Sequence, residues 1–505
     1  MTAAARLDAL AVDADNTRDI AALAKGGRTN VAGFLLRLVA RIPFLFIASR
    51  MYGAAAMGRF ASALVMVEFA GMLATLGQKR GLAQALAADG VHPANTVADA
   101  LLVATVLSIA FSIPIALFPA TMFPTGHYAA ADLLLVGSIW LLAMGDIALA
   151  ALAFRFDVAS TVRARSVVEP WTLSIAAGLF WWLYPEAGLT LSYLASCAAA
   201  TAVALWALLR AFGLPRAWRP QPSRLLALIW RNIPLAGADA VEWGTRKLDV
   251  FILRFFVGEA PLGIYFFAQQ FASLPQKLKT SFEPVLGPVI TRNVREGNMA
   301  AIGQQVCQVG FWITAAQAGI ALALAIPGTG LMGLGGPGFV VGTLALIFLL
   351  TAEVFAAPAV VSEAALVYLA PMRNLVISLL TMALQAALTL AGMWVCARLG
   401  LGQIDRISSA AGALMVTLML ASLAKAGLLS HHLKQRITSF RWSLLGAAVP
   451  AATVGVAAMR LLPEWAGISI GIPAILGLYC WVMWSRGFGQ ADRALFRKAE
   501  AREHP

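Results

Sequence analysis

YGAAAMGRFASA (residues 52–63) and VGEAPLGIYFFA (residues 257–268) follow one pattern, G-x4-G-x-aromatic-x-x-Ala. An apolar run that carries arginine precedes each stretch, and a second apolar run follows it. At the same offset, Arg41 in the first run corresponds to Arg246 in the second. The pattern predicts an internal duplication in which each copy turns tightly between two hydrophobic helices, a plan that recurs in secondary transporters. Because glycine and alanine are abundant, a chance match is the alternative.

The composition is that of a polytopic membrane protein. Hydrophobic residues make up 60% of the chain, charged residues 12%, and the mean hydropathy is +0.78. Soluble domains average roughly 45–50% apolar and about 25% charged residues. The net charge of +13 would also suit a nucleic-acid partner, but in a membrane protein Lys and Arg gather in cytoplasmic loops. We therefore expect the lipid bilayer, and no nucleic acid, as the partner of this charge.

A helix needs about 20 apolar residues to cross the hydrocarbon layer, and the chain offers about fourteen such segments. They cover residues 30–50, 60–78, 97–118, 131–153, 167–184, 190–210, 233–257, 262–285, 305–326, 339–361, 374–396, 407–429, 443–462 and 467–485. An even number of crossings places both termini on one side. Of the 38 Lys and Arg residues, the connections on the opposite side hold only Arg50, Arg59, Arg398, Arg406 and Arg460. The positive-inside rule then predicts that both termini are cytoplasmic.

These segments predict an all-α membrane fold with two pseudo-symmetric six-helix bundles and two additional C-terminal helices. The longest and most basic connection contains Pro215, Pro220 and Pro222, and we interpret it as the linker between the halves. The expected parts are a cytoplasmic N-terminal tail (1–29), the first half (30–210), the linker (211–231), the second half (232–429), two further helices (430–485) and a cytoplasmic C-terminal tail (486–505).

Several cations lie inside the apolar runs, where a charge at a helix centre costs about 2.5–3.5 kcal/mol. Arg37 and Arg41 are four residues apart in the first segment and share one face. Arg246, Lys247 and Arg254 lie in the seventh segment. Such residues must face protein, water or a ligand rather than lipid. We expect these five cations to line a central cavity and to bind an anionic substrate.

Acidic residues also enter the membrane segments. On a helical projection Asp239, Glu242, Arg246 and Asp249 fall within an arc of about 80° and so form one stripe. The family resemblance given below would make Asp239, Glu242 and Asp249 the first candidates for coupling transport to an ion gradient. Two further candidates, Glu68 and Asp146, lie in the second and fourth segments. The alternative for each acid is a structural partner for one of the buried cations.

Motifs for chemistry are missing from the sequence. We find no nucleotide-binding glycine loop, metal-ligand cluster or serine-nucleophile motif, so we expect no cofactor, no metal and no enzymatic activity. The four cysteines lie in apolar runs without C-x-x-C spacing and are expected to be core thiols.

Two regions resemble the polysaccharide transporter, or O-antigen flippase, branch of the multidrug/oligosaccharidyl-lipid/polysaccharide exporter superfamily. One runs from Asn30 through YGAAAMGRFASA to LATLGQKRGLAQALA, and the other runs from LDVFILRFFVGEAPLGIYFFAQQ to LGPVITRNVREGN. In the second region, Pro288, Arg292 and Gly297 stand where such proteins often have a Pro, a basic residue and a Gly. The resemblance implies two six-helix bundles that meet in a V, with helices one and seven beside a central cavity.

The resemblance also implies a function. In that branch, the cargo is a polyprenyl-diphosphate-linked oligosaccharide, which alternating access moves across the bacterial inner membrane for exopolysaccharide, capsule or O-antigen synthesis. A polysaccharide polymerase and a chain-length regulator are the expected protein partners. One alternative is a small-molecule or drug exporter of the same fold. The other is a membrane polymerase or glycosyltransferase, which the short outer connections disfavour.

Overall fold

The computed structural model describes residues 42–87, 92–280 and 290–493, and all regular structure in these ranges is helical. The long helices are α2 (Gly53–Thr75), α4 (Pro93–Leu117), α5 (Gly137–Phe154), α7 (Glu169–Leu183), α8 (Gly188–Phe212), α9 (Pro222–Leu253), α10 (Glu259–Thr280), α12 (Met299–Ala325), α14 (Thr343–Leu369), α15 (Pro371–Arg398), α16 (Gln403–Leu433), α17 (Trp442–Leu461) and α18 (Glu464–Val482). Within the described ranges, 10 helical segments are long and apolar enough to cross a membrane. The predicted all-α polytopic membrane fold is confirmed.

Each predicted segment after the first coincides with one long helix. The first segment, 30–50, lies mostly outside the described residues, and so do Arg37 and Arg41. Its described end starts at Ile42 and passes through a π-helical turn, η1 (Ala48–Tyr52), directly into α2. Between the halves, α8 ends at Phe212 and α9 begins at Pro222, so the non-helical part of the predicted linker is confined to 213–221. Proline suits the first turn of a helix because the amide that it lacks has no partner there.

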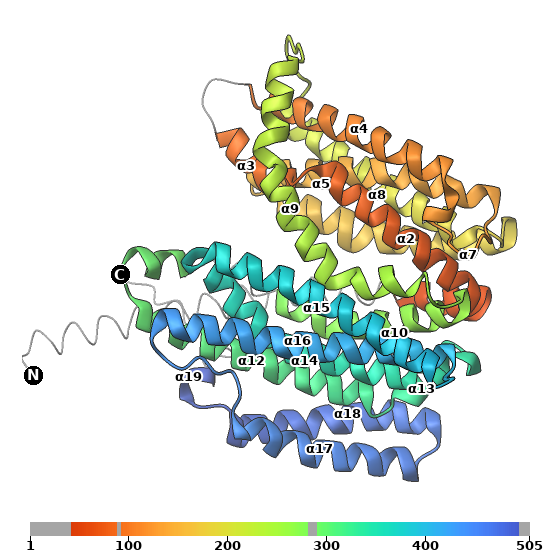
Figure 1. The fold of residues 1–505 in the computed structure, drawn as a ribbon, viewed down its shortest axis with the longest axis vertical. Coiled ribbons are helices and arrows are strands. Elements are labelled where there is room, and N and C mark those ends of the chain that lie inside the picture. Colours follow the sequence, from red (N-terminus) through yellow and green to blue (C-terminus); the bar gives the residue numbers. More distant parts are fainter. Residues whose placement is uncertain (1–41, 88–91, 281–289, 494–505) are drawn as a thin grey trace, which may run out of the picture.

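The helices form two bundles with α9 between them (Figure 1). The first bundle contains α2, α4, α5, α7 and α8, and the second contains α10, α12, α14, α15 and α16. Helix α9 packs on α2 and α3 (Gln78–Ala87) of the first bundle and on α15 and α16 of the second. The bundles come together where α2 meets α10, which is the end that the predicted topology places outside the cell (Figure 1).

The two additional helices, α17 and α18, lie on the far side of the second bundle (Figure 1). They share a buried apolar core with α12, in which Ile475 and Tyr479 are almost fully covered. The Tyr479 hydroxyl donates to the Ala315 carbonyl oxygen at 2.8 Å, and its ring lies directly over Gly319. These helices are therefore an integral part of the second bundle.

The cysteine prediction is partly wrong. Cys197 and Cys396 are buried, but Cys307 is only partly covered and Cys480, on α18, is exposed at the protein surface. In a membrane protein, an apolar helix face can point either to the protein core or to lipid, and composition does not separate the two.

The duplicated stretches cross each other at close range. A Cβ added to Gly58 of α2 would overlap the Glu259 carbonyl oxygen and lie 2.8 Å from the Gly263 nitrogen. A Cβ added to Gly263 of α10 would overlap the Ala54 carbonyl oxygen and lie 2.8 Å from the Gly58 nitrogen. Each glycine is thus required by the backbone of the other copy. We call this reciprocal contact, between Gly58 and Gly263, the glycine crossing.

Other contacts close the same end. Arg50, at the end of the first segment, donates to the carbonyl oxygens of Leu334 at 2.7 Å and Gly333 at 3.0 Å, both near α13 (Gly328–Gly333) of the second half. Phe60 of the first stretch and Phe266 of the second pack edge to face, with ring centroids 6.2 Å apart. Backbone contact, hydrogen bonds and aromatic packing therefore all join the two halves at the outer end.

We predict that Gly58→Ala and Gly263→Ala each prevent the outer end from closing, because the added methyl group has no space. Leu262, which is buried at this end, can report the change as a cysteine in a cysteine-free background. A membrane-impermeant maleimide added from outside should label Leu262→Cys several-fold faster in either glycine variant. Gly237→Ala is the matched control, since its Cβ would meet nothing within 4 Å. Unchanged labelling in both glycine variants would contradict the prediction.

Candidate functional site

Helix α9 carries most of the predicted site residues and directs them to three different neighbours. Its first acids face α3, where Arg80 lies 2.9 Å from Asp239 through Nε and 2.7 Å from Glu242 through Nη2. Arg246 lies one turn further along α9 and contacts Glu242 at 3.0 Å. Three of the four residues in the predicted stripe are therefore linked through Glu242 and Arg80.

Lys247 faces α2 rather than the stripe. Its ammonium lies 3.5 Å from the Glu68 carboxylate, and the two side chains are 30% and 28% exposed. An ion pair with this exposure contributes at most about 1 kcal/mol, because solvent screens it. The pair therefore holds the two helices together only weakly and can be exchanged for another partner.

Asp146 belongs to a chain of charges inside the first bundle. Lys79 lies 2.6 Å from it, and Arg165 also pairs with it. Arg165 continues to Glu169 at 2.8 Å. Asp146 thus has two cationic partners.

These residues form three separate groups of ion pairs, and we call the three groups together the ion-pair network. Its basic members are Lys79, Arg80, Arg165, Arg246 and Lys247, and its acidic members are Glu68, Asp146, Glu169, Asp239 and Glu242. The numbers of positive and negative charges are equal. Within the described residues, the cations of α9 at positions 246 and 247 are therefore matched by acids of the chain, whereas the cations of the first segment lie outside those residues.

Asp249 leaves the stripe and faces α10. Its carboxylate is fully buried and accepts hydrogen bonds from the Tyr265 hydroxyl and, at 3.2 Å, from Gln269 Nε2. The backbone nitrogen of Val250 donates to the other oxygen at 2.8 Å. No Lys or Arg of the described residues lies within ion-pair distance of Asp249. Among the five acidic candidates, it differs by having only neutral donors as partners.

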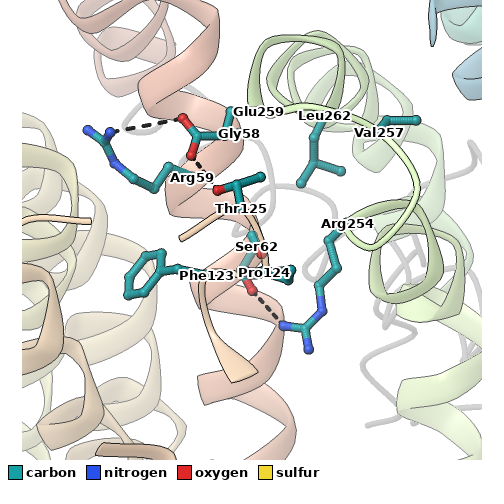
Figure 2. Close-up of a pocket in the computed structure, with 10 residues that line it drawn as sticks. All are labelled: Gly58, Arg59, Ser62, Phe123, Pro124, Thr125, Arg254, Val257, Glu259 and Leu262. Atoms are coloured by element: carbon teal, nitrogen blue, oxygen red, sulfur yellow. Dashed lines mark hydrogen bonds and ion pairs between the residues drawn. The ribbon is translucent and has the colours of Figure 1, made fainter. Parts of the chain in front are cut away.

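Arg254 lies at the outer end, about 10 Å along α9 from Lys247 at the usual rise per residue. It is 3% exposed, and its Nη1 donates to the Ser62 carbonyl oxygen at 3.1 Å. It lines a small pocket that also includes Arg59, Thr125 and Glu259 (Figure 2). The structure therefore separates Arg254 from Arg246 and Lys247, the other predicted binding cations among the described residues.

The sequence did not single out several of the residues that complete these arrangements. Lys79 and Arg80 count only as cytoplasmic loop charges in a topology argument, yet they pair with three of the candidate acids. Tyr265 occupies the aromatic position of the second duplicated stretch, but nothing in the pattern distinguishes a hydroxyl that binds a carboxylate from a packing ring. The one feature of the sequence that could have indicated these partners is the position of Lys79 and Arg80, two adjacent cations at the end of an apolar segment.

Substitutions in the pair of Glu68 and Lys247 test whether Lys247 only holds Glu68 or also binds the substrate. Glu68→Gln and Lys247→Gln should each lower the melting temperature of the purified protein slightly, because each removes an ion pair worth at most about 1 kcal/mol. The melting temperature of the double variant should return most of the way to that of the wild type, since both charges are removed together. If Lys247 only pairs with Glu68, the double variant will also regain activity in cells. Restored stability without restored activity assigns Lys247 a further role.

Comparison with known proteins identifies the fold. No protein-family model matches the sequence, and no curated protein matches it. Among solved structures, a lipid II flippase MurJ in an inward closed conformation matches with a TM-score of 0.69 and 12% identity, over 90% of this chain and 99% of that one.

Two conformations of multidrug transporters match as well. An inward-facing MATE family transporter of the MOP superfamily gives a TM-score of 0.58 at 15% identity, over 79% of this chain and 98% of that one. An outward-facing structure from the same family gives 0.56 at 14% identity, over 83% of this chain and 97% of that one. The chain therefore has the fold that MurJ and the MATE transporters share.

Proposed function

We propose that this chain is a flippase that moves a polyprenyl-diphosphate-linked oligosaccharide across the bacterial inner membrane by alternating access. Both termini would be cytoplasmic, and the product would feed exopolysaccharide, capsule or O-antigen synthesis. The observation that carries the proposal is the arrangement of the two bundles. They are joined at the outer end by the glycine crossing, and α9 carries charged residues between them deeper in the membrane.

Alternating access requires the outer end to open and close. The glycine crossing supports this because its contact needs no side chain at either glycine. Beside it, Phe60 packs against Phe266, and polar contacts also join the halves, such as the hydrogen bond from Thr125 to Glu259 at 2.7 Å and the ion pair of Arg59 with Glu259 at 4.0 Å. A partly exposed ion pair of this kind contributes about 1 kcal/mol or less. Separation of the halves would break these polar contacts at modest cost and would also part the two aromatic rings.

The cations of the site support an anionic cargo. Arg246 and Lys247 are each about one-third exposed and hold acids of the chain at 3.0 and 3.5 Å. A diphosphate carries more charge than one carboxylate, and the guanidinium fork of Arg246 fits paired phosphate oxygens. We propose that the diphosphate displaces Glu242 and Glu68 from these cations, with Arg37 and Arg41 adding charge from the first segment. A polysaccharide polymerase and a chain-length regulator would act on the released product.

Asp249 is the acid that we propose couples transport to an ion gradient. It is buried, it has only neutral donors as partners among the described residues, and it lies between α9 and α10. Uptake or loss of a proton or a metal cation would change the charge at this joint. Asp239, Glu242, Glu68 and Asp146 are already matched by Arg or Lys, so they suit this role less.

Export of small cationic molecules is the second candidate, because the ion-pair network is charge-balanced and the half-exposed Glu242 could hold a cation. The share of this chain that each structure covers supports the flippase over the exporter. The MurJ structure covers 90% of this chain, and the two MATE structures cover 79% and 83%.

The transport prediction is tested in cells and in liposomes. A deletion strain should accumulate lipid-linked oligosaccharide on the cytoplasmic face of the membrane, and its susceptibility to cationic drugs should stay unchanged. Purified protein in liposomes should move the lipid-linked oligosaccharide between leaflets. An unchanged lipid-linked pool together with increased drug sensitivity would refute the flippase and support the exporter.

The binding prediction concerns Arg246. Arg246→Gln should abolish complementation of the deletion strain at normal membrane levels, because it removes the fork that holds phosphate oxygens. Arg246→Gln also leaves Glu242 without one of its partners. The control for this effect is the double variant Glu242→Gln/Arg246→Gln, which should fail to complement as well. Full complementation by both variants would show that Arg246 is not part of the binding site.

The coupling prediction concerns Asp249. Asp249→Asn should retain downhill movement of the lipid-linked oligosaccharide in liposomes but lose its acceleration by an imposed proton or sodium gradient. Tyr265→Phe removes one hydrogen bond and keeps the carboxylate, so it should remain gradient-dependent. Gradient-driven acceleration in Asp249→Asn would exclude this residue as the coupling group.

A further inference from the structure

Arg254 is a buried cation that has no anionic partner among the described residues. Its Nη1 donates to the Ser62 carbonyl oxygen at 3.1 Å, and its Nη2 lies 3.9 Å from the Met66 sulfur. Its Nε is buried and has no hydrogen-bond partner in the part of the chain that the structure describes. Among the described residues, no Asp or Glu lies within ion-pair distance of it.

A buried guanidinium without an anion is unfavourable, because its solvation is lost and little replaces it. The rings of Phe251 and Phe255 lie 4.7 and 4.5 Å from the guanidinium carbon and offer cation–π contact. Such contacts replace only part of the lost solvation and leave the positive charge uncompensated. The position therefore requires an explanation beyond packing.

The surroundings of Arg254 contain further donors that are currently engaged. Figure 2 shows Arg59 and Thr125 both directed at the Glu259 carboxylate on the opposite side of the pocket from Arg254. Arg59 and Thr125 belong to the first half, and Glu259 begins α10 of the second half. In the closed state, Glu259 thus occupies these donors as an anion supplied by the protein itself.

We infer that Arg254 marks a second anion-binding subsite, at the outer end of the transport path, that takes a phosphate group of the cargo when the two halves separate. This inference rests on the proposed function. Separation would take Ser62 away from Arg254 and Glu259 away from Thr125 and Arg59. Arg59 would keep its partners in the first half, Asp132 at 3.8 Å and the Glu186 carbonyl oxygen at 3.0 Å, so the donors that become free are those of Arg254 and Thr125.

The geometry of Arg254 favours a phosphate over a single halide ion. Its Nε and Nη2 form the edge of the guanidinium that has no oxygen acceptor. That edge presents two parallel N–H groups, which match two oxygens of one phosphate. A phosphate arriving from the deeper cations Arg246 and Lys247 would meet this edge about 10 Å further along α9.

The test compares binding with the outer end closed and open. Wild type, Arg254→Gln, Gly58→Ala and Gly58→Ala/Arg254→Gln are placed in lipid nanodiscs, and the dissociation constants of farnesyl diphosphate and inorganic pyrophosphate are measured. Loss of Arg254 should weaken binding of farnesyl diphosphate by about tenfold or more in the Gly58→Ala background, and less than about twofold otherwise. Gly263→Ala replaces Gly58→Ala if the latter does not fold.

Two further variants sharpen the result. Arg254→Lys keeps the positive charge but lacks the guanidinium edge with two parallel N–H groups. Its affinity for farnesyl diphosphate should therefore lie between those of the wild-type residue and Arg254→Gln in the same background. In the Gly58→Ala background, where the outer end is already open, Arg50→Gln removes a positive charge from the same end, outside the pocket, and should not alter binding. Equal losses for farnesyl diphosphate and pyrophosphate support recognition of the phosphate itself, and a loss for farnesyl diphosphate alone supports a lipid-borne phosphate.

Equal affinity with and without Arg254 in both opened backgrounds would overturn the subsite. If the protein nevertheless moves lipid-linked oligosaccharide, the proposed function stands and only the subsite is wrong. If farnesyl diphosphate binds through Arg254 but no lipid-linked oligosaccharide is moved, the subsite stands and the proposed cargo is wrong.

Discussion

The contact between Gly58 and Gly263 is the constraint on which the arrangement of the two halves depends. Both positions lack a Cβ because the backbone of the opposite copy occupies that space. Close backbone approach is the usual reason for small residues between membrane helices, where no hydrophobic force drives association. Once α2 and α10 are this close, Arg59 reaches Glu259 and Arg254 reaches Ser62. The closed outer end follows from these two glycines.

The deeper charges form three groups of ion pairs, two of which include residues of α9, and within the described residues five positive charges face five negative ones. Ion pairs such as Glu68 with Lys247 are only weakly stabilising because both side chains retain solvent contact. A balanced network of weak pairs can exchange one acid for an incoming anion without leaving a cation bare. Arg254 and Asp249 are the two exceptions, since each is buried without a charged partner in the part of the chain that the structure describes.

Asp249 and Arg254 lie on the helix that runs between the two bundles, where we propose that the cargo passes. Asp249 lies at the joint of α9 and α10, and Arg254 lies at the outer end of α9, next to the glycine crossing. A change of charge at the first site acts on the helix that carries the second. Coupling, binding and opening would then share one element, which contacts both bundles.

The sequence by itself determined the membrane class, the positions of the helices and the repeated glycine turns, because hydrophobic length and glycine spacing are local properties. It also placed Asp239, Glu242 and Arg246 on one stripe, and these three are linked in the structure. Only the tertiary structure decided the partners: Arg80 joined that stripe, Asp249 turned to Tyr265, and Cys480 faced outward. The partners of a side chain depend on which helices become neighbours and on which apolar faces meet lipid. The periodicity of apolar residues in the sequence gives no information on either. That the two glycine turns meet each other was likewise fixed by packing, since the pattern of each turn specifies its own bend and not its partner.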